Sequence, residues 1–257
     1  MTREEELFQK RLLDLADTAW RRNIVTYTDF LNLNEQNIYH DSLQKLSFIQ
    51  SESFGGYESA ERQMVAFIPD ALSRDRGYFS QASFPIACLK IRPLNVKFSD
   101  KLTHRDYLGS LMNLGIDRSR TGDIVIQDQD AWLFCQKKIA DYVAGELTRV
   151  RHTAVSCLVC SPQEVHYQPS LQELTGTVAS VRLDSLLSLA FQTSRSSITA
   201  LIQGGKTFAN GRLVTSNGYH VKEGDIISVR GLGRFRYDGV LSATKKGRCL
   251  VRIQKYV

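Results

Sequence analysis

The last third of the sequence concentrates positive charge, and this is the first chemistry that the residues suggest. Residues 180–257 contain thirteen Lys or Arg against four Asp or Glu, whereas residues 1–72 contain seven against twelve. Such a basic segment attracts polyanions, and nucleic acid and an anionic membrane surface are the two candidates. A membrane partner would need a lipidation signal or a basic amphipathic helix, and the sequence shows neither. We therefore expect nucleic acid as the partner and no membrane contact.

Phosphate recognition requires cationic side chains together with backbone N–H groups that approach the anion closely. The pattern predicts a helix capped by Ser194, whose first N–H groups would face a phosphate, and a type I′ turn at Asn210-Gly211. The residues expected to contact the nucleic acid are Arg182, Ser194, Arg195, Ser196, Lys206, Asn210, Gly211, Arg212, Lys222, Arg230, Arg234 and Arg236. An alternative for Arg182 is a structural ion pair with Asp184 at the start of a helix.

A second group of candidate RNA-contacting residues lies in the middle of the chain. Arg105, Arg118 and Arg120 form a candidate second RNA contact. Trp132 and Phe134 stand two positions apart on an expected strand, so both side chains point to the same face and could stack on bases. A core face is the favoured interpretation for this aromatic pair, because the usual aromatic ribonucleoprotein motif is absent.

Two other patterns could suggest metal or acid–base chemistry. Cys157 and Cys160 form a C-x-x-C, but three residues apart on a strand the two thiols face opposite sides and cannot meet one metal. His104 and Asp106 could form an acid–base pair, but Asp106 is placed to cap a helix. We expect no catalytic residue, no metal site and no cofactor.

The N-terminal segment, residues 1–72, is expected to be a small α+β unit. Apolar residues at helical spacing predict a helix over 2–22, and a second helix is expected from Thr28 through Ile38. Strands are expected at 47–53 and 64–69, with a turn at Gly55-Gly56 between them. This glycine pair, followed by Tyr57 and Glu61-Arg62, could alternatively form a loop that approaches a phosphate.

The middle segment, residues 73–165, predicts the order β-α-β-β-α-β. Strands are expected at 85–93, 123–127, 131–135 and 153–160, with helices at 102–115 and 136–147. Thr103 and Asp106 are spaced to cap the first helix and Gly115 to end it. This order is typical of ferredoxin-like folds, including RNA-recognition domains. Residues 161–175 are expected to form a linker, and the stretch 70–80 to form the boundary with the N-terminal unit.

The basic segment, residues 178–257, resembles the RNA-binding domain of ribosomal protein S4. The resemblance is carried by spaced helix caps, turn glycines and basic residues: Arg182-Leu183-Asp184, Ser194-Arg195-Ser196, Ile202, Lys206, Asn210-Gly211 and Gly224-Asp225. It implies two helices and a following hairpin that together form one basic face for structured RNA.

The upstream segments extend the resemblance to nearly the whole chain. FLNLNEQ, FGGYESAER and LTHRDYLGSLMNLGIDRSRTGDI, followed by the S4-like segment, are similar to the YlmH family of Gram-positive bacteria. The resemblance implies an RNA-binding protein encoded near cell-division genes. It also implies association with the large ribosomal subunit in quality control, where rRNA and peptidyl-tRNA would be partners.

Two other functions remain as alternatives to a non-catalytic RNA-binding role. The chain could be an RNA-modifying enzyme of the pseudouridine synthase or methyltransferase type, although no G-x-G-x-x-G is present. It could also be a cell-division-associated interaction protein. The acidic start MTREEELF is unlike a secretory signal, and five cysteines do not suggest a disulfide framework, so a cytoplasmic location is expected. We separately expect a monomer.

Overall fold

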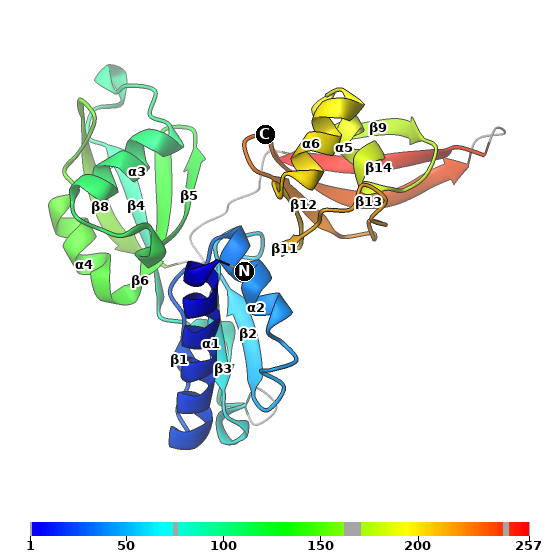
Figure 1. Cartoon of the computed structure of the whole chain (residues 1–257). Coiled ribbons are helices and arrows are strands. Elements are labelled where there is room, and N and C mark those ends of the chain that lie inside the picture. Colours follow the sequence, from blue (N-terminus) through cyan, green and yellow to red (C-terminus); the bar gives the residue numbers. More distant parts are fainter. Residues whose placement is uncertain (1, 74–76, 162–170, 244–246, 257) are drawn as a thin grey trace. The chain divides into compact units, whose positions relative to one another are not determined.

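The computed structural model describes residues 2–73, 77–161, 171–243 and 247–256. The chain divides into two compact units, Met1–Tyr167 and Gln168–Val257. The first unit contains a three-stranded and a five-stranded sheet, and the second contains a six-stranded sheet (Figure 1). The expected α+β class is therefore confirmed.

The N-terminal part of the first unit packs two helices on the three-stranded sheet β1-β3-β2. Its elements are α1 (Arg3–Arg22), β1 (Thr26–Tyr27), α2 (Leu33–Asp41), β2 (Gln50–Phe54) and β3 (Met64–Ile68). The expected start of the second helix at Thr28 is wrong. Asn32 caps α2 by accepting the N–H groups of Asn34 and Glu35, so the helix begins at Leu33. Thr28 instead pairs with Val65, which extends the sheet contact.

The middle part of the first unit has the expected ferredoxin-like order. Its elements are β4 (Ile86–Pro93), α3 (His104–Asn113), β5 (Thr121–Gln127), β6 (Asp130–Gln136), α4 (Lys137–Glu146), β7 (Arg149–Val150) and β8 (Thr153–Cys160). The antiparallel sheet has the order β5-β6-β4-β8-β7. Both helices pack against one face of it, through buried residues such as Tyr107, Leu133 and Val143. Short 3₁₀ turns lie at Asp70–Leu72, Gln81–Ser83, Val96–Phe98 and Arg118–Arg120.

The second unit is a six-stranded sheet with two helices on one face. Its elements are β9 (Leu171–Val178), α5 (Leu183–Phe191), α6 (Arg195–Gln203), β10 (Thr207–Ala209), β11 (Arg212–Leu213), β12 (Ile226–Val229), β13 (Gly233–Ala243) and β14 (Cys249–Tyr256). The strand order is β11-β10-β12-β13-β14-β9. The expected linker is wrong for residues 171–175, because β9 pairs along its whole length with β14. Residues 162–170 of that linker and residues 74–76 of the expected boundary lie outside the described residues.

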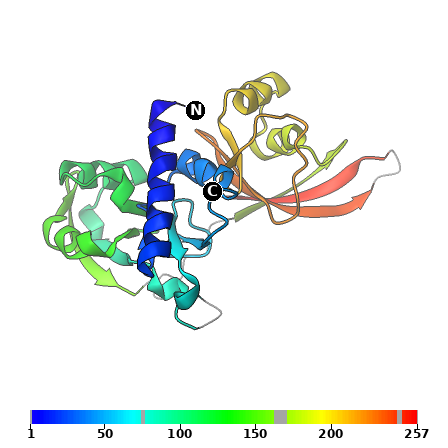
Figure 2. The ribbon, with the colours of Figure 1, turned by 60° about the horizontal axis from the view of Figure 1, so that its bottom comes forward.

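Strand alternation gives this second sheet two different faces. Ile227, Val229, Phe235 and Ile253 point toward α5 and α6 and are at most 3% exposed. Residues between them point to the opposite face, because successive side chains of a strand alternate. In both views β13 and β14 extend beyond the two helices (Figures 1 and 2).

Candidate nucleic-acid interface

The start of α6 presents donors and a cation to solvent. Ser194 caps the helix by accepting the N–H of Ser197 at 3.3 Å, and its hydroxyl lies 3.1 Å from that of Ser196. Ser194, Arg195 and Ser196 are all exposed. The remaining N–H groups of the first turn, together with the positive end of the helix dipole, suit an anion.

A cavity of about 280 Å³ lies beside this helix start. Arg195 and Thr199 of α6 line it from one side, and Arg182 and Ser185 at the start of α5 line it from the other. Arg182 does form the ion pair considered above, with its Nη2 2.8 Å from Asp184 Oδ2 and its Nε 3.2 Å from Oδ1. The two guanidinium groups therefore border one polar hollow, but that of Arg182 is already oriented by Asp184.

The turn at Asn210-Gly211 has the expected conformation, with φ of 48° and 78°. The Asn210 side chain is engaged inside the unit. Its Nδ2 donates to Asp225 Oδ1 at 2.7 Å, and its Oδ1 accepts the N–H of Ile226 at 2.9 Å. The structure thus gives Asn210 a role in holding the turn against the start of β12. Arg212, which follows the turn, and Lys222 are exposed.

Lys206 and Arg230 are neighbours at one end of β10 and β12. The N–H of Arg230 donates to the carbonyl of Lys206 at 2.9 Å, and both side chains are exposed. The Arg230 guanidinium lies 5.1 Å from the ring centroid of Phe208. Phe208 is outside the core that packs on the helices, yet it is 1% exposed. Its ring is therefore buried on the opposite face of the sheet.

Arg234 and Arg236 also lie on that opposite face. Arg234 pairs across the ladder with Ser228, and Arg236 pairs with Gln254, whereas the intervening Phe235 packs toward the helices. Arg236 donates to Asp238 at 2.7 Å, and this bond lowers the pKa of the Asp238 carboxyl. The structure thus places the expected RNA-binding residues on two sides of the sheet. Their roles in RNA binding remain predictions.

The three arginines of the second candidate contact have different surroundings. The Arg118 guanidinium donates to the carbonyls of Thr121 at 3.0 Å and Gly122 at 2.7 Å. Burial lowers the pKa of Arg118 to about 10. Arg118 thus supports the loop that leads into β5, whereas Arg105 is exposed and Arg120 is half-buried.

Phe134 is covered by the loop between β2 and β3. The Tyr57 ring stacks on the Phe134 ring with centroids 5.0 Å apart and planes at 28°, and Phe134 is fully buried. A Cβ on Gly56 would lie 2.3 Å from Phe134 Cδ1, so the loop approaches this ring closely. The favoured interpretations of a turn at Gly55-Gly56 and of a buried Phe134 are confirmed, and Trp132 is 9% exposed.

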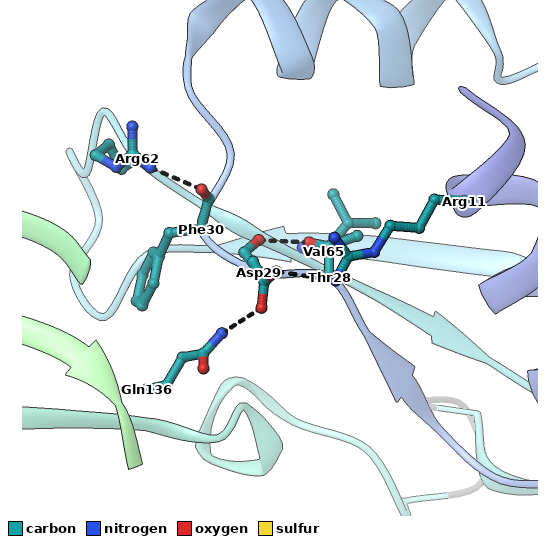
Figure 3. Close-up of polar contacts among 7 residues, drawn as sticks. All are labelled: Arg11, Thr28, Asp29, Phe30, Arg62, Val65 and Gln136. Atoms are coloured by element: carbon teal, nitrogen blue, oxygen red, sulfur yellow. Dashed lines mark hydrogen bonds and ion pairs between the residues drawn. The ribbon is translucent and has the colours of Figure 1, made fainter. Parts of the chain in front are cut away.

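Polar contacts hold the same junction together. Asp123 accepts the Tyr57 hydroxyl and the N–H of Glu61, each at 2.7 Å. Arg62 donates to the carbonyl of Phe30, as Figure 3 shows, and to that of Thr121. One guanidinium thus joins the segment before α2 to the start of β5.

A second polar bridge starts from Asp29. This residue accepts Gln136 Nε2 at 2.6 Å and Arg11 Nη2 at 2.9 Å (Figure 3). Asp29 thus links α1 to the end of β6, which attaches the N-terminal helix to the middle sheet.

The remaining candidates have structural roles. Cys157 belongs to the core under the helices and Cys160 to the cluster on the other sheet face, as the strand spacing predicts. Asp106 accepts the N–H and hydroxyl of Thr103 at 2.8 and 2.7 Å and therefore caps α3. Across the described parts of the chain, no three His, Cys, Asp or Glu side chains are grouped to hold a metal. None of the helices in those parts combines the length and apolarity needed to cross a bilayer.

Sequence reasoning missed the strands β9, β13 and β14. Alternating apolar residues, such as Phe235 and Tyr237 in β13 and Val251 and Ile253 in β14, were a usable signal for two of them. It also missed Arg252 of β14, whose Nε lies 3.8 Å from Oδ2 of Asp238, the carboxylate that Arg236 also contacts. The Arg62–Asp123 junction carried no local signal, because its partners lie 61 positions apart.

Comparison with protein-family models gives three matches in chain order. Residues 4–72 match the N-terminal domain of YlmH, and residues 80–164 match the RNA-binding domain in YlmH. Residues 181–227 match the S4 domain. The two YlmH models fall in the first compact unit, and the S4 model spans α5 to the start of β12.

Similar proteins were also found. The ribosome-associated protein quality control protein P2 of Bacillus subtilis (strain 168) is 28% identical over 257 residues, covering 98% of this chain and 96% of the relative. The solved structure of the cell division protein YlmH from Streptococcus pneumoniae is similar with a TM-score of 0.53 at 18% identity. This match covers 64% of this chain and 96% of that chain, and it concerns the fold alone.

Proposed function

Because this chain belongs to the YlmH family of bacterial RNA-binding proteins, we propose that it is a ribosome-associated factor of protein quality control. Support comes from the two YlmH domain matches, the S4 match and the full-length similarity to a ribosome-associated quality control protein. The finer proposal is that the second unit binds structured rRNA or tRNA on the large subunit. The protein would act in the cytoplasm as a monomer, without catalysis and without a cofactor.

One observation carries this proposal: the exposed start of α6 beside the cavity that Arg182 and Arg195 line. N–H donors at a helix start and a guanidinium next to them can bind one phosphate together. A polyanion with phosphates at fixed spacing would also engage Lys206 and Arg212. Structured RNA offers such a surface, which favours it over a small anion.

The three segments would divide the work. We retain 1–72 and 73–165 as separate N-terminal and RNA-recognition-like domains, and we propose that the C-terminal domain begins with β9 at Leu171 instead of at 178. In the middle domain, Tyr57 occupies the position over Phe134 where a base could stack. Any RNA contact of that domain would therefore use its exposed surface, such as Arg105, and the half-buried Arg120.

The test reverses charge at two positions of the second unit. The double variant Arg195→Glu/Lys206→Glu should lose most of its sedimentation with bacterial ribosomes, because both side chains are exposed cations. If the wild-type protein neutralises about five phosphates, log affinity falls with log salt at a slope of about −3.5 to −4.5. Losing two contacts should bring that slope closer to zero by about 2.

A matched control reverses two exposed cations of α1, in Arg3→Glu/Lys10→Glu. It changes net charge equally, and it should sediment with ribosomes as the wild type does. Ribosome binding by the Arg195→Glu/Lys206→Glu variant equal to that of this control would show that the second unit is not the main RNA contact.

A further inference from the structure

The strands beyond the S4 match carry a row of arginines on the sheet face that points away from α5 and α6. Arg234 and Arg236 on β13 and Arg252 on β14 alternate with Phe235, Val251 and Ile253, which are fully buried under the helices. Arg230 follows β12 in the same alternation. We name these four residues, Arg230, Arg234, Arg236 and Arg252, the sheet surface.

Two of these arginines lie over aromatic rings. The Arg234 guanidinium is 4.3 Å from the Tyr256 ring centroid, and that of Arg230 is 5.1 Å from the Phe208 ring centroid. A ring under a guanidinium attracts its positive charge and restricts the conformations of the arginine side chain. Such a group can stack on a base and bind a phosphate, and less of its side-chain entropy remains to be lost on binding.

The sheet surface combines four arginines with acidic residues on the same sheet face. Asp238 lies 2.7 Å from Arg236 and 3.8 Å from Arg252, and it is the acidic residue that contacts both. The side chains of Arg236 and Arg252 remain 42% and 39% exposed despite these contacts. The register places a second acidic residue on this face, Glu173, which accepts Gln254 Nε2 at 3.1 Å. Among the described residues of these strands, the arginines of the sheet surface thus outnumber the carboxylates of its face.

We propose that the sheet surface is a second RNA-binding surface, which binds an RNA segment different from the one bound at the start of α6. The proposal rests on RNA binding by the second unit as the proposed function. The sheet lies between the two surfaces, so one short helix of RNA cannot contact both. Arginines stacked on aromatic rings fit bases and phosphates better than they fit a lipid headgroup layer, which needs exposed apolar residues for insertion.

The experiment counts bound RNA on the full chain. Native mass spectrometry with a short RNA hairpin as the probe gives the number of hairpins per protein, and fluorescence titration gives their affinities. Arg230→Gln/Arg234→Gln should lose one bound hairpin, with its affinity reduced about tenfold or more, and should keep the hairpin that depends on Arg195. The converse variant, Arg195→Glu, should weaken the other hairpin alone.

Two further variants control for charge and folding. Lys10→Gln/Arg22→Gln removes two exposed charges from α1 and should bind RNA as the wild type does. Arg230→Lys/Arg234→Lys keeps the charge without the planar fork, and it should retain the second hairpin at reduced affinity. If the Lys variant retains the second hairpin, the loss of that hairpin in the Gln variant is due to a lost contact and not to a lost fold.

The outcomes distinguish this inference from the proposed function. If Arg230→Gln/Arg234→Gln keeps every hairpin at wild-type affinity while Arg195→Glu weakens one, the sheet surface proposal is overturned and the proposed function stands. If neither variant changes RNA binding, both fail. Loss of binding to phosphatidylglycerol vesicles without a change in RNA binding would also overturn the proposal.

Discussion

Asn210 and Arg212 illustrate how two neighbours in one turn take different roles. Asn210 bonds to Asp225 and Ile226 and adopts a positive φ that few residues tolerate, whereas Arg212 is exposed. Substitution of a residue that both stabilises the turn and binds RNA would change stability and RNA binding together. The structure separates these functions, since the Asn210 side chain is engaged on both its oxygen and its nitrogen.

We therefore predict opposite phenotypes at these two positions. Asn210→Ala should lower the free energy of unfolding by about 2 kcal/mol, because it removes two hydrogen bonds and leaves buried Asp225 without one of its partners. Arg212→Ala should leave stability within about 0.5 kcal/mol but weaken RNA binding. Urea denaturation and RNA titration measure both variants. An Asn210→Ala protein of wild-type stability would contradict the structural role.

At the scale of elements, the loop between β2 and β3 covers part of one face of the middle sheet. Gly55 and Gly56 allow the backbone to approach, Tyr57 covers Phe134, and Asp123 fixes the loop by three hydrogen bonds. The sheet face that RNA-recognition domains use for stacking is thus partly closed by the chain itself. This contact joins the N-terminal and middle parts within the first unit.

We predict that Gly56→Ala destabilises this junction by about 2 kcal/mol or more. The glycine has φ of +102°, and an added methyl group would lie against the Phe134 ring. Gly109→Ala in α3 is the matched control, since its Cβ would meet nothing within 4 Å and alanine favours a helix. Urea midpoints should fall for Gly56→Ala and rise slightly for Gly109→Ala. Equal midpoints for the two variants would refute the close packing at Gly56.

At the scale of the whole molecule, the chain combines two YlmH domains with an S4 domain whose sheet is extended by β13, β14 and β9. The Arg182-Leu183-Asp184 sequence, which could suggest a pseudouridine synthase, forms an ion pair at the start of α5. Within the described residues, the polar clusters that we identify support loops, caps and domain contacts.

We predict that deleting the gene removes no RNA modification. Nucleoside analysis of rRNA and tRNA from the deletion strain should match the parent strain, because the proposed role is binding without bond chemistry. The ribosome-bound fraction of the protein, measured in the parent strain, confirms that the factor was active under the growth conditions. A modified nucleoside that disappears on deletion and is restored by purified protein would establish an enzyme instead.

The sequence by itself determined features that depend on neighbours in the chain. The helix starts at Thr103 and Ser194, the turn at Asn210-Gly211, the ferredoxin-like order and the basic last third all follow from caps, spacing and composition. The caps and turns among these features depend on contacts between residues that are close in sequence. A short sequence pattern is therefore enough to predict them. The start of α2 was predicted wrongly, because the residues from Thr28 onward also fit a helical pattern. The helix actually begins after its capping residue, Asn32.

Only the tertiary structure decided which side of a sheet each arginine occupies and which segment covers Phe134. The sequence gives no sign that Arg195 and Arg234 lie on different sides of the sheet. Arg195 begins α6 on one face, whereas strand register directs Arg234 to the opposite face. Phe134 is buried by Tyr57, which lies 77 positions earlier, and residues 171–175 became part of a strand because β14 pairs with them. These outcomes depend on pairing between residues that are far apart in the chain. Such contacts form only in the complete fold, so a short sequence segment does not predict them.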